Sequence, residues 1–480
     1  MNPSLYWHDY ETSGLNPALD RPLQFAGVRT DPDLNIIDEP TMLYCQPPLD
    51  RLPHPSACWV TGLVPQELMQ SGLPEWRFIE AIHRELSRPG TCGVGYNTIR
   101  FDDEVTRFCL YRNFYDPYAR EWQHGNSRWD IIDMLRLARA LRPDGIHWPD
   151  HEDGVPSFRL EDLSAANGIE HGEAHDALAD VLATIAVARL VKAAQPKLYE
   201  YVYSHRTKAR VSPLIDLQRR LPFLHVSSRL PRENGYLALM MPLCRHPTNA
   251  NAIIAFNLMA EPRVLVDLDS DELRQRLFTP AADLPEDVER LALKGVHINR
   301  CPIVATTRLL DGHRAKTLGI DLARCEANWR YLLGHDLTEK ISQVFTRTDS
   351  PDEADAEAAL YLGFIPDQDR SSLARVRTTS PEQLADTDIN FQDPRYRELL
   401  FRYRARYAEH TLGQAERERW RSLRERWLHD EHSGSGLLTH TAYRAELDRL
   451  AMEPHLDARQ QALLSQLRAW GEVVIGRLAN

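Results

Sequence analysis

The spacing of apolar residues changes repeatedly between a strand period and a helix period from Leu5 to about Lys197. The first apolar run reaches Glu11, and the turn residue Gly14 follows it. Strand-like spacing recurs at 23–29, 42–45 and 92–96, and helical spacing predicts helices over 76–86, 131–141 and 176–191. Strands that alternate with helices are typical of an α/β domain.

The pattern of apolar and polar residues changes twice after this region. Short strand-like runs, with one helix expected over 271–277, predict a small β domain; they cover 223–226, 236–240, 252–256, 264–268, 296–298 and 302–305. Beyond about residue 349 the sequence is helical and rich in Arg, Glu, Leu and Ala, with breaks near Pro366, Pro381, Pro394 and 433–436. We therefore predict three domains, at 1–195, 196–349 and 350–480.

Composition limits the class of protein. The chain has 480 residues, 43% of them hydrophobic, and a formal net charge of −12, which argues against a protein that coats nucleic acid with a basic surface. A local basic channel remains compatible with that total. The seven cysteines are odd in number and dispersed, which is typical of reduced intracellular thiols. We find no signal peptide pattern and no membrane-spanning apolar run, so we expect a cytoplasmic protein that does not enter a membrane.

The candidate chemistry begins with two carboxylates on the first strand. Residues i and i+2 of a strand point to the same face, so Asp9 and Glu11 project together while Tyr10 faces away. Adjacent carboxylates repel each other and favour a divalent cation. A lone Asp-x-Glu pair is common on solvated strands, so its partners decide its meaning. These are Phe101-Asp102 and the His175-to-Asp180 segment, which places a histidine and a carboxylate near the start of one helix.

Three details stay open on the residues alone. Asp103 directly follows Asp102, so spacing does not settle which of the two binds metal. His171 and His175 lie four residues apart and could suggest zinc, but Gly172 disfavours a helix that would align both rings. The Gly93-x-Gly95 pair lacks the rest of a dinucleotide fingerprint and is attributed to strand packing.

The ordered set Asp-x-Glu, Phe-Asp and His-x-x-x-x-Asp resembles the motifs of the DEDDh 3'→5' exonucleases, which have a DnaQ-like, RNase H-like fold. The segments 8–12, 18–22, 95–97, 100–107, 111–118, 127–130 and 157–161 are similar to the bacterial exonuclease I family. The resemblance implies an RNase H-like α/β domain with a mixed sheet, then an SH3-like β-barrel and an α-helical C-terminal domain. It also places the metal ligand of the second motif immediately after Phe101, at Asp102.

The chemistry that follows is hydrolysis of single-stranded DNA from its 3' end to 5'-mononucleotides, in DNA repair and recombination. Two divalent ions assist such a reaction, and oxygen ligands favour Mg²⁺, with Mn²⁺ as a substitute. The expected metal ligands are Asp9, Glu11, Asp102 and Asp180. His175 would accept the proton of the attacking water, since an imidazole titrates near neutrality. The family implies processive digestion.

Substrate contacts are expected from aromatic rings, which stack on bases of any sequence, and from Arg and Lys, which neutralise phosphate. Half or more of the aromatic residues between the second and third motifs are expected in the core. The predicted single-strand contacts are Arg107, Tyr118, Trp122, Arg136 and Lys208. Glu11 and Arg159 are the predicted contacts to the terminal nucleotide.

The family further implies that the C-terminal tail of single-stranded DNA-binding protein docks on the enzyme, which we expect to be a monomer. Arg142, Tyr201 and Arg220 are the predicted pocket, and Leu221 replaces a basic residue of the relatives. Two other functions are alternatives: an RNA-trimming, oligoribonuclease-like enzyme and a non-catalytic scaffold for single strands. The length beyond Lys197 disfavours the first, and the intact set of acids disfavours the second.

Overall fold

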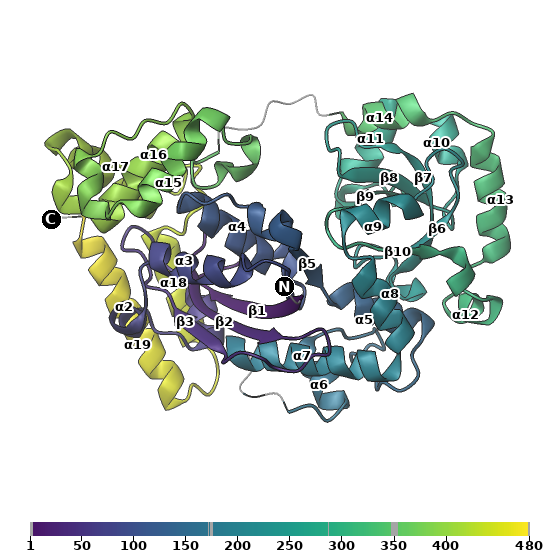
Figure 1. Ribbon diagram of the computed structural model, residues 1–480, viewed down its shortest axis with the longest axis horizontal. Coiled ribbons are helices and arrows are strands. Elements are labelled where there is room, and N and C mark those ends of the chain that lie inside the picture. The colour runs from purple at the N-terminus through teal and green to yellow at the C-terminus, as the bar shows by residue number, and fades with distance from the viewer. Residues whose placement is uncertain (1–2, 171, 173–175, 287, 347–353, 479–480) are drawn as a thin grey trace. The chain divides into compact units, whose positions relative to one another are not determined.

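The structure, a computed structural model, describes residues 3–170, 172, 176–286, 288–346 and 354–478 (Figure 1). These residues form two compact bodies. The first body comprises 1–127, 172–182 and 351–480, and the second comprises 128–171 and 183–350. The predicted domain boundaries at 195/196 and 349/350 divide the chain differently from these two compact bodies. They stay predictions.

The first strand, which carries Asp9 and Glu11, lies in a five-stranded mixed sheet of strand order β3-β2-β1-β4-β5. Its strands are β1 (Ser4–Thr12), β2 (Pro22–Thr30), β3 (Thr41–Tyr44), β4 (Thr91–Gly95) and β5 (Ser127–Asp130). β1 pairs antiparallel with β2 and parallel with β4. The strands expected at 23–29, 42–45 and 92–96 are thus confirmed within a residue or two.

Helices cover this sheet and close its core. They are α1 (Pro55–Thr61), α2 (Pro65–Ser71), α3 (Glu75–Leu86), α4 (Asp102–Arg112) and α7 (Ala177–Ala194). Tyr6, Tyr10 and Phe25 from the sheet pack with apolar residues of α3 and α4 in one buried cluster. The opposite face of β1 therefore carries Asp9 and Glu11. Gly95 lies so close to β1 that a Cβ there would approach the His8 carbonyl oxygen to 2.9 Å, which agrees with the predicted packing role.

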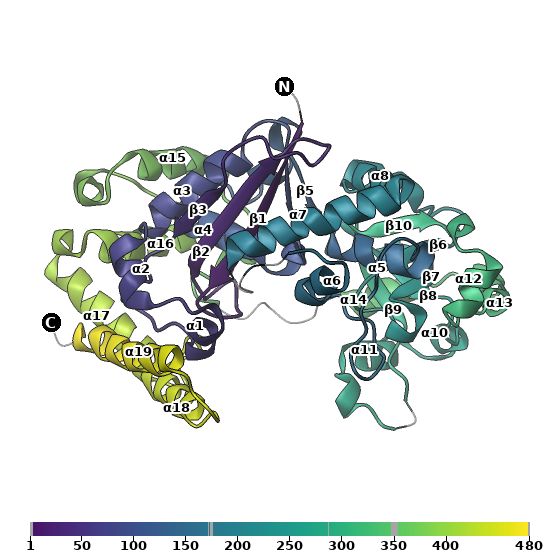
Figure 2. The same cartoon turned by 90° about the horizontal axis from the view of Figure 1, so that it is seen from below.

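The C-terminal helices belong to the same body. They are α15 (Arg370–Thr378), α16 (Pro394–Tyr407), α17 (Gln414–His429), α18 (His440–Ala451) and α19 (Ala458–Gly476). α18 and α19 pack beside α1 and α2 and share an apolar cluster with them (Figure 2). Buried charge joins the two regions as well: Glu357 accepts hydrogen bonds from Arg21 (2.7 Å), Arg51 (2.6 Å) and Arg406. The helical character expected after residue 349 is confirmed.

The second body contains another five-stranded sheet, of order β10-β6-β7-β8-β9. Its strands are β6 (Phe223–Val226), β7 (Leu237–Arg245), β8 (Ala252–Asn257), β9 (Leu293–His297) and β10 (Ile303–Thr306). The helices around it are α5 (Ile132–Leu141), α6 (Leu160–Ala166), α8 (Pro196–Ser204), α9 (Lys208–Val211), α10 (Arg263–Asp267), α11 (Ser270–Phe278), α12 (Gly312–Thr317), α13 (Leu322–Leu333) and α14 (Thr338–Phe345). Val211, Phe223, Met240 and Val304 are among the residues of its core.

The strand expected at 264–268 is wrong, because this run forms α10. Its burial follows a helical pattern, with Leu265 as the fully buried position. Lys340 donates its Nζ protons to the carbonyl oxygens of Leu265, Val266 and Leu268, at 2.8–3.2 Å. These carbonyls would otherwise lack partners at the helix C-terminus. A contact distant in sequence thus outweighs the local strand propensity.

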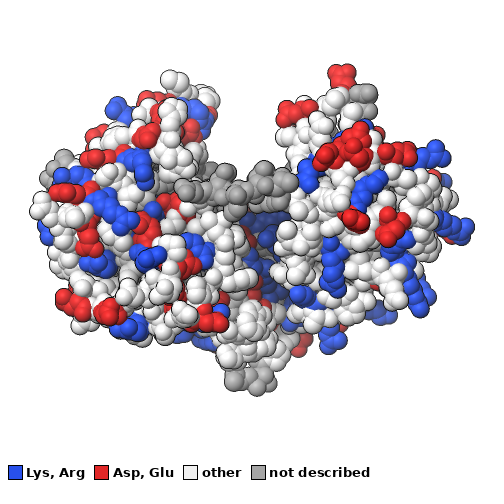
Figure 3. Space-filling model, turned by 90° about the horizontal axis from the view of Figure 1, so that it is seen from above, with Lys and Arg blue, Asp and Glu red and all other residues white. Residues whose placement is uncertain are grey.

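Charge is mixed on the surface. On the face that Figure 3 shows, Lys and Arg side chains are interspersed with Asp and Glu side chains on both bodies. Among the described residues, no helix combines the length and the apolar character needed to cross a membrane. On this face the acidic excess behind the net charge of −12 leaves room for local basic sites.

Candidate active site

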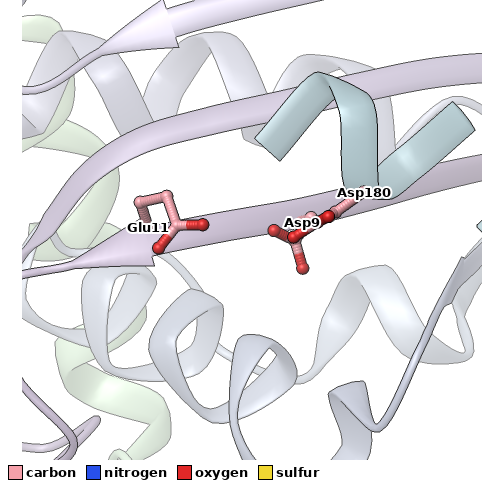
Figure 4. A group of neighbouring side chains, drawn as sticks. All are labelled: Asp9, Glu11 and Asp180. Carbon is pink, nitrogen blue, oxygen red and sulfur yellow. The ribbon is translucent and has the colours of Figure 1, made fainter. Parts of the chain in front are cut away.

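The site is built on β1, where side-chain alternation sets the direction of each acid. Tyr10 points into the core formed with α3 and α4, so Asp9 and Glu11 project from the other face. Figure 4 shows both carboxylates on that side of the strand. The predicted pairing of these two acids on one face is borne out.

The third acid comes from α7. Asp180 lies in the first turn of this helix, and its N–H donates to the carbonyl oxygen of Asp176 at 3.1 Å. Ligand oxygens of Asp9, Glu11 and Asp180 lie within 4.8 Å of one another (Figure 4). Three half-buried carboxylates at this separation form a group that suits a divalent cation with hard oxygen ligands.

Asp102 approaches the group from the second motif. Because β1 and β4 run parallel, their carboxyl ends meet at one edge of the sheet, and α4 begins at Asp102 just beyond β4. The Asp102 carboxylate accepts a hydrogen bond from the backbone N–H of Tyr10 at 3.1 Å. Thr106 donates its hydroxyl proton to the Asp102 carbonyl oxygen at 2.8 Å. The structure therefore places Asp102 against β1 between the two expected strand acids.

Asp103 has different contacts from those of Asp102. It lies in the first turn of α4, and its carboxylate forms a buried ion pair with Arg120 at 2.6 Å. His8 lies near this pair, and burial lowers the pKa of its imidazole to about 4. These contacts favour Asp102 over Asp103 as the residue that serves the acid cluster.

The acids raise one another's proton affinity. Burial raises the pKa of Glu11 to about 8, and the neighbouring carboxylates of Asp180 and Asp102 add to the effect. Burial and the charge of Asp102 likewise raise the pKa of Asp9 well above its ordinary value. Four carboxylates in one desolvated region are unstable as anions without a compensating cation. The residues present therefore fit a divalent metal.

His175, the predicted proton acceptor, and Arg159, a predicted contact to the terminal nucleotide, differ in whether the structure describes them. His175 and His171 lie outside the described residues, so the proton acceptor and the alternative zinc pair stay predictions. Arg159 is described in the second body, where 64% of its side chain is exposed and its guanidinium lies 3.4 Å from Glu161.

The predicted strand contacts of the first body fall into two kinds. Trp122 is 65% exposed, as a stacking platform must be. Arg107 is buried and forms ion pairs with Glu104 (2.8 Å) and Glu121 (2.7 Å), while its guanidinium stacks on Tyr118. Arg107 is thus already neutralised by two carboxylates, which the sequence did not indicate. Its role as a phosphate contact stays a prediction.

The predicted strand contacts of the second body are Arg136 and Lys208. Arg136 forms an ion pair with Asp133, and its guanidinium lies over the rings of Phe158 and Tyr236. Lys208 is an exposed residue of α9 that donates to the Asn251 side-chain oxygen at 2.6 Å. Arg136 and Lys208 each have a polar or aromatic neighbour within the protein. Their roles as DNA contacts stay predictions.

The predicted partner pocket also lies in the second body. The Tyr201 hydroxyl donates to the Val304 carbonyl oxygen at 2.8 Å, and Tyr201 lines a small cavity with Trp129 and Ile303. Arg142 is exposed at the end of α5. Leu221, at the position where the relatives have a basic residue, is 40% exposed.

Arg220, the third predicted pocket residue, has a second task. Its guanidinium donates to three backbone carbonyl oxygens at the end of α13, those of Leu332, Leu333 and His335, at 2.8–3.2 Å. This cap satisfies carbonyls that the helix leaves without partners. The proposed role of Arg220 in a partner pocket stays a prediction.

The sequence did not indicate two residues that support the acid cluster and its surroundings, Gln24 and Arg120. Gln24 contacts the start of α7, and Arg120 holds Asp103. The available signal for Gln24 was a polar side chain inside an otherwise apolar strand. Arg120 offered no comparable signal, because it lies in a polar turn between β4 and β5.

Three family models match successive parts of the chain. The model described as Exonuclease matches residues 6–188, that of the Exonuclease I SH3-like domain matches 206–347, and that of the Exonuclease I C-terminal domain matches 354–474. Exodeoxyribonuclease I of Escherichia coli K12 is 44% identical over 471 residues, which cover 98% of each chain. The resemblance seen in the motifs therefore extends over nearly the whole chain.

Solved structures agree in fold. Exonuclease I from Methylocaldum szegediense is 48% identical, with a TM-score of 0.94 over 98% of this chain and 100% of that chain. E. coli Exonuclease I in complex with a dA16 oligonucleotide is 44% identical, with a TM-score of 0.92 over 98% and 100%. A structure of SSB/Exonuclease I with an inhibitor is 43% identical, with a TM-score of 0.90 over 99% and 100%. On its motifs, its fold and its full-length similarity, this chain belongs to the exonuclease I family.

Proposed function

We propose that this chain removes 5'-mononucleotides from the 3' end of single-stranded DNA, in DNA repair and recombination. One observation carries the proposal: carboxylate oxygens of Asp9, Glu11 and Asp180 gather within 4.8 Å on an exonuclease fold. The oligonucleotide bound by E. coli Exonuclease I supports single-stranded DNA as the substrate.

The four acids share one task in the proposed reaction, which is to hold the metal. Asp9, Glu11, Asp102 and Asp180 would hold two divalent ions, for which we propose Mg²⁺, with Mn²⁺ as a substitute. When bound, such ions would supply charge neutralisation at the phosphate and would favour ionisation of the attacking water near neutral pH. The hydrogen bond from the Tyr10 N–H fixes the Asp102 carboxylate before substrate binds.

The remaining residue roles rest on the sequence and the family. We propose His175 as the proton acceptor for the attacking water and Arg159 with Glu11 as contacts to the terminal nucleotide. The exposed ring of Trp122 supports base stacking, for which Tyr118 is a second candidate. Arg107, Arg136 and Lys208 would compensate phosphate charge along the strand.

The proposed partner, oligomeric state and location also rest on the sequence and the family. We propose that the C-terminal tail of single-stranded DNA-binding protein docks at Arg142, Tyr201 and Arg220, a proposal supported by the solved SSB/Exonuclease I structure. We propose a monomer in the cytoplasm, where reduced thiols are the rule. The seven cysteines form no disulfide among the described residues.

The test is a labelled oligonucleotide assay with Mg²⁺. Asp180→Asn keeps the size of the side chain and removes one ligand charge, so we expect activity to fall by at least about 100-fold. Asp33→Asn, at an exposed position outside the acid group, is the matched control and should retain full activity. An Asp180→Asn protein that is as active as wild type would refute the assignment.

Two substrate comparisons complete the test. We expect a blunt duplex to be degraded far more slowly than a single strand, since one strand must enter the site. A DNA oligomer should also be degraded faster than an RNA oligomer of the same sequence. Equal rates on DNA and RNA would favour the oligoribonuclease-like alternative, and binding without Mg²⁺-dependent cleavage would favour the non-catalytic scaffold.

A further inference from the structure

A buried glutamine lies beside the acid cluster. Gln24 of β2 is directly opposite Glu11 of β1 in the antiparallel ladder, so both side chains project from the same face of the sheet. One step along that face, Ala26 is opposite Asp9. Ala26 has no polar side chain to offer Asp9, whereas Gln24 presents an amide on the face that carries Glu11. Only 4% of Gln24 is exposed.

The Gln24 amide holds the first residues of α7 at both of its ends. Its Nε2 donates to Oδ1 of Asp176 at 3.1 Å, and its Oε1 accepts from the backbone N–H of Ala177 at 3.4 Å. The backbone N–H can only donate, which fixes the orientation of the amide. A neutral side chain that is donor and acceptor at once therefore links the sheet to the helix start.

The link continues to the metal-binding acid. Asp180 lies one turn into α7, and its N–H donates to the carbonyl oxygen of Asp176. A shift of residues 176–177 would thus move Asp180 relative to Asp9, with which it shares the acid cluster. Metal sites depend on such outer contacts to hold the ligands in place.

We propose that Gln24 is a positioning residue, which sets the start of α7 so that Asp180 meets Asp9 and Glu11 at the separation that a divalent ion needs. The inference rests on the proposed metal site. Glutamine suits this position because a carboxylate there would add charge beside Glu11 and Asp176, while a hydrocarbon would leave the Asp176 carboxylate and the Ala177 N–H without this partner.

The decisive variant is Gln24→Met, which keeps the length of the side chain. It removes the hydrogen bonds to Asp176 and Ala177, together with the longer ones that Nε2 donates to Met42 and Tyr44 of β3. Gln24→Asn, one methylene shorter, is the second variant and serves if the first does not fold. Gln46→Met is the matched control, because Gln46 donates to the Met69 carbonyl oxygen within the same body, and among the described residues its side chain has no hydrogen bond to α7. All three are prepared as the full chain.

The measurement is the affinity for Mn²⁺ by titration calorimetry without DNA, with affinity for a labelled oligonucleotide in EDTA as the second readout. We expect Gln24→Met to bind Mn²⁺ about 10–100-fold more weakly than wild type, with unchanged DNA affinity, and Gln46→Met to match wild type. A loss of less than fivefold in Mn²⁺ affinity would overturn the proposal. A parallel loss of DNA affinity would also overturn it, because that result indicates a general structural defect.

The proposed function fails in a different way. If wild type and Asp180→Asn bind Mn²⁺ equally well, the acid cluster is not the metal site, whatever Gln24 does. If wild type binds Mn²⁺ more tightly than Asp180→Asn while Gln24→Met equals wild type, the metal site stands and the positioning role is excluded.

Discussion

Metal affinity should depend steeply on pH, because the metal-free site holds protons that the metal must displace. Burial and neighbouring acids raise the pKa of Glu11 to about 8. Metal ions bind the deprotonated carboxylate, so protonated Glu11 competes with the metal. Affinity should therefore rise as the pH rises toward 8, and the acids should release protons when the metal binds.

The size of the effect follows from the pKa of Glu11. With a pKa of about 8, roughly 1% of the Glu11 carboxyl is ionised at pH 6 and about half at pH 8, so affinity should change about 50-fold, or about 2 kcal/mol. Asp9, whose pKa is also raised, should add to this change. The same groups make the metal-free folded state bind more protons than the unfolded chain. Their contribution to stability is therefore lost as the pH rises through about 8.

Titration calorimetry with Mn²⁺ measures both quantities. Dissociation constants at pH 6 and pH 8 give the ratio, and runs in two buffers of different ionisation enthalpy give the number of protons released. Asp33→Asn should behave like wild type, whereas Asp180→Asn should bind weakly at both values. Equal wild-type affinities at the two pH values, with no proton release, would refute the reasoning about the buried acids.

Two further predictions concern stability and DNA binding. Glu357→Gln removes the shared partner of Arg21, Arg51 and Arg406 and should lower the free energy of unfolding by about 3–5 kcal/mol in thermal or urea melts, whereas the exposed Glu425→Gln should not. Wild-type stability in Glu357→Gln would mean that the buried charges do not act as a network. Trp122→Ala should weaken binding to a labelled single strand by about 1–3 kcal/mol in fluorescence anisotropy. Phe278→Ala, at another exposed aromatic residue, is the control, and equal losses in both variants would contradict a specific role for Trp122.

The strands and helices were predictable where local pattern and tertiary burial agree. All nine residues of β2 are buried, which agrees with the apolar run in the sequence. That run predicts the strand without further information. The run at 264–268 has a similar composition but forms α10, since Lys340, more than seventy residues away, caps its carbonyl oxygens. Sequence alone gives no information on such a distant contact.

The candidate site was predictable to the extent that its chemistry lies in motifs. The i, i+2 spacing of Asp9 and Glu11 determines their shared face, and α7 carries Asp180 to that face. The supporting contacts were not predictable, because they join distant segments. Gln24 meets Asp176 across 152 positions, and Arg107 is paired with acids where the sequence indicated a free basic residue.

The central claim is that the acids of the three motifs, Asp9, Glu11, Asp102 and Asp180, hold two metal ions together. Anomalous diffraction from crystals soaked in Mn²⁺ tests it most directly. We predict two peaks about 3.5–4 Å apart, each within about 2.5 Å of carboxylate oxygens drawn from Asp9, Glu11, Asp102 and Asp180. Crystals that bind Mn²⁺ elsewhere and show no peak among these carboxylates would contradict the account.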